Sequence, residues 1–135
     1  MIFVDTSFWV AARLRQDSHH DEAIALSQLF RHERLVTSNL VRGETWTFLR
    51  RRDGHRTGVA FLDSLSRTAL VEVVFVNETF EEQALRWLRR HDEREYSFVD
   101  ATSFALMRSL KIREALAFDG DFTAAGFTEL RQPSA

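Results

Sequence analysis

The sequence predicts an α/β domain in which a central parallel sheet of four or five strands lies between two layers of helices. The chain has 135 residues, which is the length of one domain. Short apolar runs alternate along it with segments of helical periodicity, and strands that are separated by helices pair in parallel. No linker, repeat or low-complexity stretch interrupts the sequence. We therefore expect residues 1–135 to form a single domain, with 131–135 as a short tail.

The first half of the chain predicts two strands and three helices. A short apolar run is typical of a buried strand, and an apolar stripe at 3.6-residue spacing is typical of a helix. Ser18 and Asp21 resemble a capping box at the start of the first helix, and Ser38 or Asn39 can cap the second. The expected elements are a strand at residues 2–4, a helix at 17–32, a strand at 35–36, a helix from 39 to about 52 and a helix at about 56–68.

The second half predicts three strands and two helices. Its most strand-like stretch combines β-branched residues with an aromatic. The expected elements are a strand at residues 71–76, a helix at 77–91, a helix at 97–110, a strand at 115–118 and a strand at 127–130. In an open parallel sheet, ligands bind beyond the carboxyl ends of the strands. The residues that directly follow the strands are therefore the first candidates for a functional site.

The composition excludes several classes of protein. Apolar residues make up 44% of the chain and charged residues 28%, as in ordinary globular domains. The absence of cysteine excludes disulfides and thiolate metal sites. The apolar runs are far shorter than the ~20 residues of a membrane helix. No basic segment precedes the apolar run at Ile2, so we expect a cytoplasmic protein rather than a secreted one.

The charge composition has one unusual feature. The net charge of −2 does not by itself indicate a nucleic-acid binder. Of the 18 basic residues, however, all but Lys111 are arginine. Arginine suits bidentate contact with phosphate or carboxylate. The arginine content fits either that use or a codon bias that favours arginine throughout.

Four acidic residues stand where the crevice of such a sheet would form. Asp5 and Asp119 directly follow expected strands, and Glu44 and Asp100 lie in the first turns of expected helices. Taken singly, each has an ordinary interpretation as a helix cap, a solvated helix residue or part of a turn. Taken together they would converge, and converging carboxylates need a cation. Oxygen ligands alone favour a hard cation such as Mg²⁺ or Mn²⁺.

Four segments of the chain resemble the PIN-domain nucleases, most closely the VapC-type toxins of toxin–antitoxin pairs. In order, they are IFVDTSFWVA, TSNLVRGETWTFLRRR, YSFVDATSFALMRSLKI and AFDGDF. The resemblance covers essentially the whole chain. It implies a PIN-like α/β/α fold and an endoribonuclease that depends on Mg²⁺ or Mn²⁺. It also implies RNA as substrate, a homodimer, and a cognate antitoxin whose C-terminal tail occupies the acidic groove.

The same resemblance implies roles for individual residues. The acidic positions of the family, which bind metal and carry catalysis, match Asp5, Glu44, Asp100 and Asp119. Asp121 could share or replace the role of Asp119. Ser7 matches a hydroxyl residue that would orient Asp5, whereas Ala117 stands where the family often has threonine or serine.

The implied reaction is hydrolysis of an RNA phosphodiester bond. Metal held by Asp5 and Asp100 would position the scissile phosphate and activate a water, and Glu44 and Asp119 would complete the cage. Without these four acids the chain has sixteen acidic residues against eighteen basic ones. The overall net charge therefore does not exclude an RNA substrate.

The densest basic stretch follows Glu44 on the same expected helix and in its loop, and comprises Arg50, Arg51, Arg52 and Arg56. These side chains would contact the RNA phosphate backbone. The alternative is an ordinary solvated helix end, where cations are favoured by the helix dipole.

Three further groups of residues have both a functional and a structural interpretation. Trp9, Trp46 and Phe48 could stack unpaired bases, or pack in the core or a dimer interface. The arginines of residues 86–95 alternate with acids, which predicts a solvated surface of internal ion pairs. Residues 17–22 are rich in acids and histidine, but acids are expected at a helix start, so a second metal site is not favoured.

Other function classes fit less well. A flavodoxin-like phosphoacceptor domain would need an early pair of acids and a lysine after a late strand, and Lys111 precedes the last two strands. A PIN-like module that has lost catalysis and only binds RNA or protein would not need all four acids. A nuclease for DNA structures needs insertions that a chain of 135 residues does not contain. The sequence leaves the RNA target and the choice of ion open.

Overall fold

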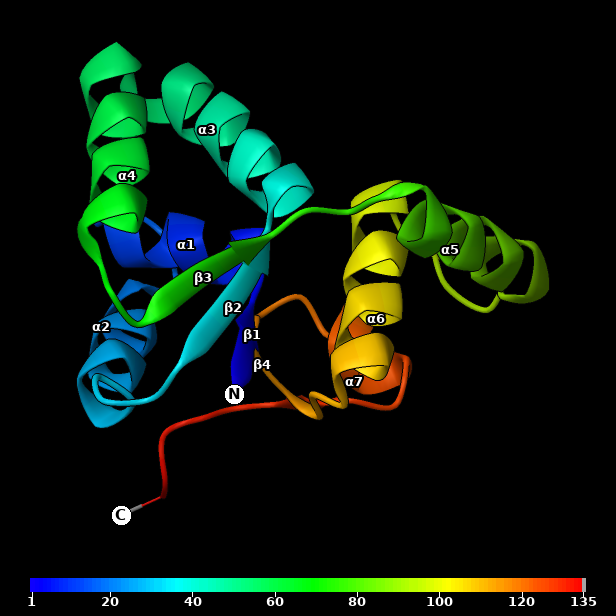
Figure 1. Ribbon diagram of the computed structural model, residues 1–135. Helices are drawn as coiled ribbons and strands as arrows, with labels where there is room; N and C mark the ends of the chain where they lie inside the picture. Colours follow the sequence, from blue (N-terminus) through cyan, green and yellow to red (C-terminus); the bar gives the residue numbers. More distant parts are fainter. Residues whose placement is uncertain (135) are drawn as a thin grey trace.

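The computed structural model describes residues 1–134, within which seven helices surround a five-stranded sheet (Figure 1). The strands are β1 (Ile2–Val4), β2 (Leu35–Ser38), β3 (Val71–Val74), β4 (Glu114–Leu116) and β5 (Thr128–Glu129). The helices are α1 (Thr6–Arg13), α2 (His20–Leu29), α3 (Asn39–Asp53), α4 (His55–Arg67), α5 (Glu78–Arg90), α6 (Phe98–Leu110) and α7 (Asp121–Ala124). The strand order is β3-β2-β1-β4-β5, and each neighbouring pair is parallel.

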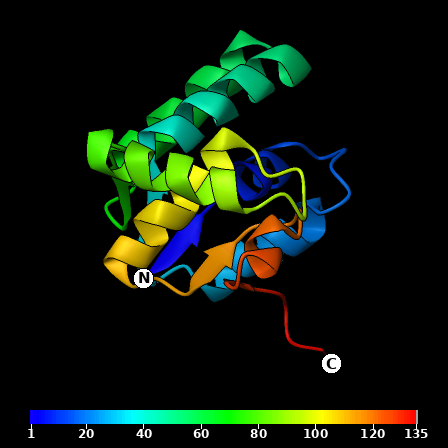
Figure 2. The same ribbon diagram turned by 90° about the vertical axis from the view of Figure 1, so that its right-hand side faces the viewer.

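The sheet separates two hydrophobic clusters, because alternate side chains of β1 point to opposite faces. Ile2 and Val4 pack with residues of α1 and α2 on one face, and Phe3 packs with Phe104 of α6 on the other. Figures 1 and 2 show α5, α6 and α7 on this second side. The three-layer α/β/α arrangement expected from the sequence is confirmed. None of the helices within residues 1–134 has the length and apolar character needed to cross a membrane.

Side-chain caps begin three of the longer helices, including the cap at Ser38 that the sequence predicts. Ser38 accepts a hydrogen bond from the Val41 N–H at 3.0 Å and caps α3. Asn77 caps α5 through the N–H of Phe80. A capping box that includes Ser97 opens α6. The caps satisfy backbone donors that the first turn of a helix leaves without partners.

The N-terminal third differs from the sequence prediction in two ways. The structure contains α1, which follows β1 after a single residue, so no loop marks its start. The expected helix at 17–32 is shorter, and the predicted capping box of Ser18 and Asp21 is wrong. His19 occupies the N-cap of α2 without a side-chain cap bond, and its Nδ1 lies 3.4 Å from the Ser18 hydroxyl.

Near the other end of the chain, the structure contains the four-residue helix α7, which the sequence does not predict.

Helices α3 and α4 form a hairpin that projects from the sheet (Figures 1 and 2). The turn between them is Gly54, at φ 99°, a conformation that favours glycine. Leu49 and Phe61 pack between the two helices and α1. Gly58 lies against the indole of Trp46: a Cβ atom at this position would stand 2.7 Å from Cζ3 of that ring. The hairpin therefore closes through a glycine-to-tryptophan contact.

We expect Gly58→Ala to lower the free energy of unfolding by about 1–3 kcal/mol, because the added methyl displaces Trp46. Gly43→Ala is the matched control, since a Cβ at that helical glycine meets nothing within 4 Å. This control should raise the same free energy by up to about 1 kcal/mol, as expected for alanine in a helix. Urea denaturation of both variants measures the difference, and equal effects would refute the close contact.

Candidate metal centre at the carboxyl edge of the sheet

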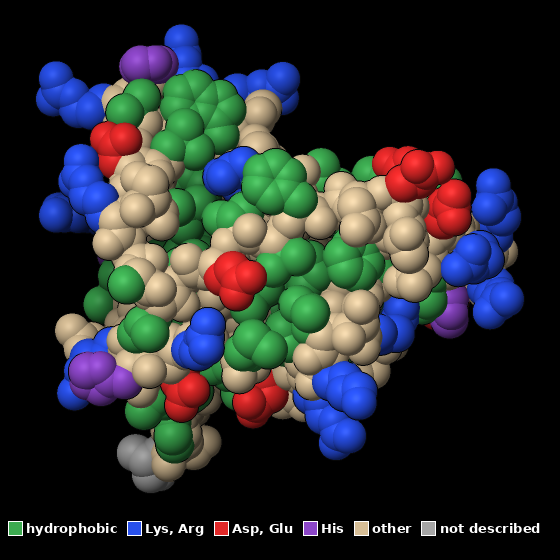
Figure 3. All heavy atoms as spheres, in the orientation of Figure 1, with side chains coloured by type: hydrophobic (Ala, Val, Ile, Leu, Met, Phe, Trp, Pro, Cys, Tyr) green, Lys and Arg blue, Asp and Glu red, His purple; other side chains and the backbone are tan. Residues whose placement is uncertain are grey.

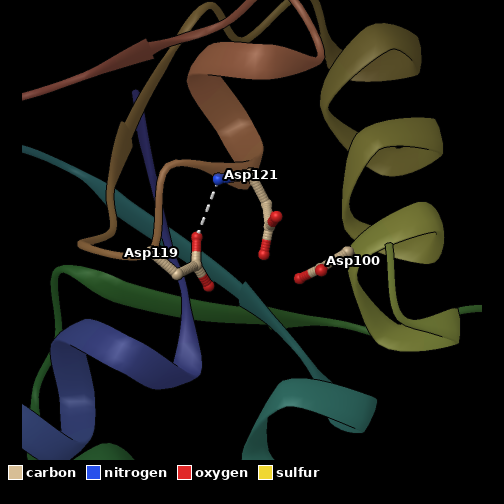
Figure 4. Close-up of side chains that lie close together, drawn as sticks. All are labelled: Asp100, Asp119 and Asp121. Atoms are coloured by element: carbon tan, nitrogen blue, oxygen red, sulfur yellow. Dashed lines mark hydrogen bonds between the residues drawn. The ribbon is translucent and has the colours of Figure 1, made fainter. Parts of the chain in front are cut away.

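Three carboxylates converge beyond the carboxyl ends of β1 and β4 (Figure 4). Asp100 comes from the first turn of α6, Asp119 from the loop after β4, and Asp121 from the start of α7. One oxygen from each lies within 4.8 Å of the others. Asp100 is buried and Asp119 is exposed, so the group opens to solvent on one side. Three oxygen donors at this spacing suit a hard divalent cation.

Asp5 lies beside this group and is almost completely buried, with 2% of its surface exposed. Its Oδ2 accepts two hydrogen bonds from Ser7, one from the N–H at 3.1 Å and one from the hydroxyl at 2.7 Å. The same hydroxyl accepts a bond from the N–H of Phe118 at 3.0 Å. Ser7 therefore fixes the Asp5 carboxylate and joins the end of β1 to the loop that carries Asp119.

Asp100 has both of the roles that the sequence suggests for it. Its Oδ2 accepts a bond from the N–H of Ser97 at 3.2 Å, and the Ser97 hydroxyl accepts one from the N–H of Asp100 at 2.9 Å. This capping box fixes the carboxylate at the start of α6. The structural and the site interpretation of Asp100 are thus compatible.

Arg94 is a site residue that the sequence interpretation missed. Its Nε donates to Asp121 Oδ1 at 2.7 Å, and its Nη2 donates to the carbonyl of Asp119 at 3.0 Å. The prediction that the arginines of residues 86–95 pair among their own neighbours is therefore wrong for Arg94. Its partner lies 27 residues away in sequence, and local charge alternation does not indicate such a contact.

Glu44 reaches the site from α3 and is exposed. Its Oε1 accepts a hydrogen bond from the Thr6 hydroxyl at 2.6 Å. Glu44 and Asp119 both line a cavity of about 480 Å³, which we call the acidic groove. His19 lines the same groove and stacks on Phe118 with ring centroids 4.5 Å apart. Neither Thr6 nor His19 was predicted from the sequence to line this groove.

Burial and neighbouring negative charges raise the pKa of Asp5, Asp100 and Asp119. Burial, together with the charge of Asp119, raises the pKa of Asp5 to about 8, although the bonds from Ser7 lower it. Burial raises the pKa of Asp100 to about 7, and the charges of Asp119 and Asp121 add to this effect. The pKa of Asp119 is also raised, by the protein atoms around its carboxylate and by its acidic neighbours. A bound cation would reverse these shifts.

The predicted RNA-binding arginines divide into two pairs. Arg51 and Arg52 line a second cavity, of about 460 Å³, which we call the arginine groove. Arg50 and Arg56 are exposed and are not among the residues that line it. Figure 3 shows basic side chains gathered around the end of the α3–α4 hairpin.

The aromatic residues near the acids also divide. Trp9 packs edge-on against Phe61, with ring centroids 5.7 Å apart. Trp46 packs against His55 and Gly58 within the α3–α4 hairpin. The structural interpretation therefore holds for both tryptophans. Phe48 differs, since 38% of its surface is exposed.

We expect Ser7→Ala to lower the free energy of unfolding by about 1 kcal/mol, because the part-buried N–H of Phe118 loses its acceptor. The pKa of Asp5 should rise further, since the Ser7 hydroxyl lowers it. Urea denaturation and a carboxyl NMR titration measure the two effects. Ser7→Thr keeps the hydroxyl and should restore both, while Ser66→Ala removes an exposed hydroxyl as a control. An unchanged Asp5 pKa in Ser7→Ala would contradict the contact.

The raised pKa of Asp5 makes the stability of the metal-free protein depend on pH. The folded state keeps a proton on Asp5 up to about pH 8, whereas the unfolded chain releases it near the ordinary value of 3.8. Stability from this group is therefore complete below that lower value and is lost as the pH rises to about 8. Asp5→Asn should raise the free energy of unfolding by on the order of 2 kcal/mol near pH 8 and by less near pH 5.

Urea denaturation in EDTA at the two pH values tests this expectation. Asp63→Asn replaces a half-exposed carboxylate on α4 and serves as the matched control. A stability difference for Asp5→Asn that is the same at both pH values would show that Asp5 is ionised throughout.

Comparison with known proteins identifies the family. The PIN domain family model matches residues 2–128. The 23S rRNA-specific endonuclease VapC20 of Mycobacterium tuberculosis is 55% identical over 131 residues, which cover 97% of this chain and 98% of VapC20. The crystal structure of Mycobacterium tuberculosis VapC20, described as a sarcin-ricin loop cleaving toxin, matches with a TM-score of 0.90 and 53% identity. That match covers 98% of this chain and 100% of the other.

A more distant structure shares the fold alone. FitAcB from Neisseria gonorrhoeae matches with a TM-score of 0.68 at 15% identity, over 96% of each chain. The family resemblance that the four sequence segments indicate is confirmed by the family model and by VapC20. PIN domains are nucleases, and they generally use divalent metals. With its acidic residues at the carboxyl edge of a parallel sheet, this chain belongs to the PIN-domain family.

Proposed function

We propose that this protein is a metal-dependent endoribonuclease that acts as the toxin of a toxin–antitoxin pair. The observation that carries the proposal is the convergence of Asp100, Asp119 and Asp121 within 4.8 Å at the carboxyl edge of the sheet. The 55% identity to VapC20 over nearly the full length of both chains supports the reaction class. Oxygen donors alone, with raised pKa values at Asp100 and Asp119, fit Mg²⁺ or Mn²⁺.

The residues of the site have different roles in the proposed reaction. Asp100, Asp119 and Asp121 would hold the ion, with Asp5, which Ser7 fixes, as a further ligand. A divalent ion held there would supply positive charge for the phosphate and would lower the pKa of the attacking water. Glu44 is the acid best placed to orient that water, because it is exposed in the acidic groove and its Oε1 is held by a neighbouring hydroxyl.

Arg94 limits what Asp121 can contribute. One oxygen of Asp121 is occupied by the Arg94 guanidinium, so the other oxygen is left for the ion. Asp119 lines the acidic groove and has no arginine on its carboxylate within residues 1–134, and one of its oxygens accepts the N–H of Asp121 at 3.1 Å (Figure 4). We therefore assign Asp119 as the fourth acid of the family pattern and Asp121 as an auxiliary ligand.

The substrate we propose is large-subunit ribosomal RNA, at its sarcin-ricin loop. VapC20 is named for 23S rRNA and for cleavage of that loop. An RNA of this kind is cut in the cytoplasm, where we place the activity. As in other VapC-type toxins, we propose a homodimer and a cognate antitoxin whose tail enters the acidic groove.

We expect the purified protein to cleave an RNA hairpin that carries the sarcin-ricin sequence when Mg²⁺ or Mn²⁺ is added, and to stop in EDTA. Asp100→Asn should lower kcat/KM by more than about 100-fold, because it removes a charged ligand while its amide oxygen can still accept the capping bond. Gel analysis of end-labelled RNA measures the rate.

The control for this experiment is Asp63→Asn, the same change on α4 outside the site. It should cleave as fast as the parent protein. Full activity in Asp100→Asn, or in EDTA, would refute a metal-dependent site at these acids. RNA binding without cleavage under any metal would instead indicate a PIN-like binding module.

A further inference from the structure

Phe48 stands where the acidic groove meets the arginine groove. It lines both cavities, as does Glu44 one helical turn earlier on α3. With 38% of its surface exposed, its ring is accessible to a ligand. The two grooves thus adjoin at Glu44 and Phe48, and Asp119 lines the first whereas Arg51 and Arg52 line the second.

The surroundings of Phe48 suit a nucleotide. The guanidinium carbon of Arg52 lies 5.1 Å from the centroid of the Phe48 ring, within the range of a cation–π contact. Arg51 and Thr47 also line the arginine groove. An aromatic face with arginine beside it is the arrangement by which proteins stack an unpaired base and hold its phosphate.

Resting on the proposed ribonuclease function, we propose that Phe48 and Arg52 form a subsite that binds one unpaired RNA base next to the scissile phosphate. The base stacks on the Phe48 ring, and the two arginines of the groove contact the adjoining phosphate. A residue on α3 one turn beyond Glu44 lies about 6 Å further along the helix, so the subsite serves a nucleotide next to the cleaved bond. RNA duplexes bind it poorly, because their bases are already stacked.

Phe75 provides a matched control within the chain. It is also exposed, at 62%, and Arg42 lies 5.5 Å from its ring centroid. It is not among the residues that line the acidic or the arginine groove. The pair of Phe75 and Arg42 therefore reproduces the composition of the subsite without its position.

The experiment measures kcat/KM on the sarcin-ricin hairpin, first intact and then with single abasic nucleotides placed along the loop. Phe48→Ala should lower kcat/KM for the intact RNA about tenfold, the loss expected for one base stack. Phe48→Trp should retain the rate, and Phe75→Ala should not change it. One abasic position should slow the parent protein by a similar factor and should not slow Phe48→Ala any further.

The possible results separate a failure of the proposed ribonuclease function from a failure of the proposed subsite. If the parent protein cleaves no RNA, the proposed function fails. If it cleaves RNA but Phe48→Ala is equally fast, or responds to every abasic position as the parent does, the subsite is refuted. Sedimentation at the assay concentration tests whether a second copy of the chain covers Phe48 instead. A change from dimer to monomer in Phe48→Ala, with an unchanged abasic pattern, would assign this ring to a protein interface and overturn the proposal.

Discussion

Repulsion between carboxylates is the constraint around which the carboxyl edge of the sheet is organised. Asp5 is 2% exposed and Asp100 is 8% exposed, and burial together with the charge of Asp119 raises the pKa of both. Buried charges of one sign cost folding free energy, so a chain selected only for stability would replace them with neutral residues. A cation is the physical partner that removes this cost, and its binding then adds to the stability of the fold.

The remainder of the domain keeps these groups together in spite of their repulsion. The strand order sets β1 directly beside β4, so the residues that follow the two strands are neighbours. Phe3 and Val4 of β1 are fully buried, one on each face, and this anchors the strand that leads into Asp5. Ser7 then hydrogen-bonds across the gap to Phe118. Packing of the core and a single hydroxyl thus fix positions that electrostatics alone would drive apart.

The sequence was sufficient for the order of most elements and for placing Asp100 and Asp119 at the same edge of the sheet, because both depend on local signals. Apolar periodicity and caps such as Ser38 lie within a few residues of the feature they predict. The contacts that shape the site are not local: Arg94 reaches Asp121 and Thr6 reaches Glu44, across 27 and 38 residues. The short helix α7 packs by its one buried residue, Phe122, and four residues are too few to show helical periodicity.

The composition alone did not explain why almost all basic residues of the chain are arginine. Around the loop that carries Asp119, two of these arginines have a structural use. Arg94 bridges the Asp121 carboxylate and the Asp119 carbonyl. Arg131 bridges the Ala117 carbonyl at 2.7 Å and Glu129 at 3.1 Å. In each arginine, two nitrogens of one planar guanidinium donate to two different acceptors. The single ammonium of lysine does not reproduce this geometry. Ala117 has no hydroxyl, but its backbone carbonyl accepts a hydrogen bond from Arg131. At positions 94 and 131, the fork geometry of the guanidinium, rather than codon usage, accounts for the presence of arginine.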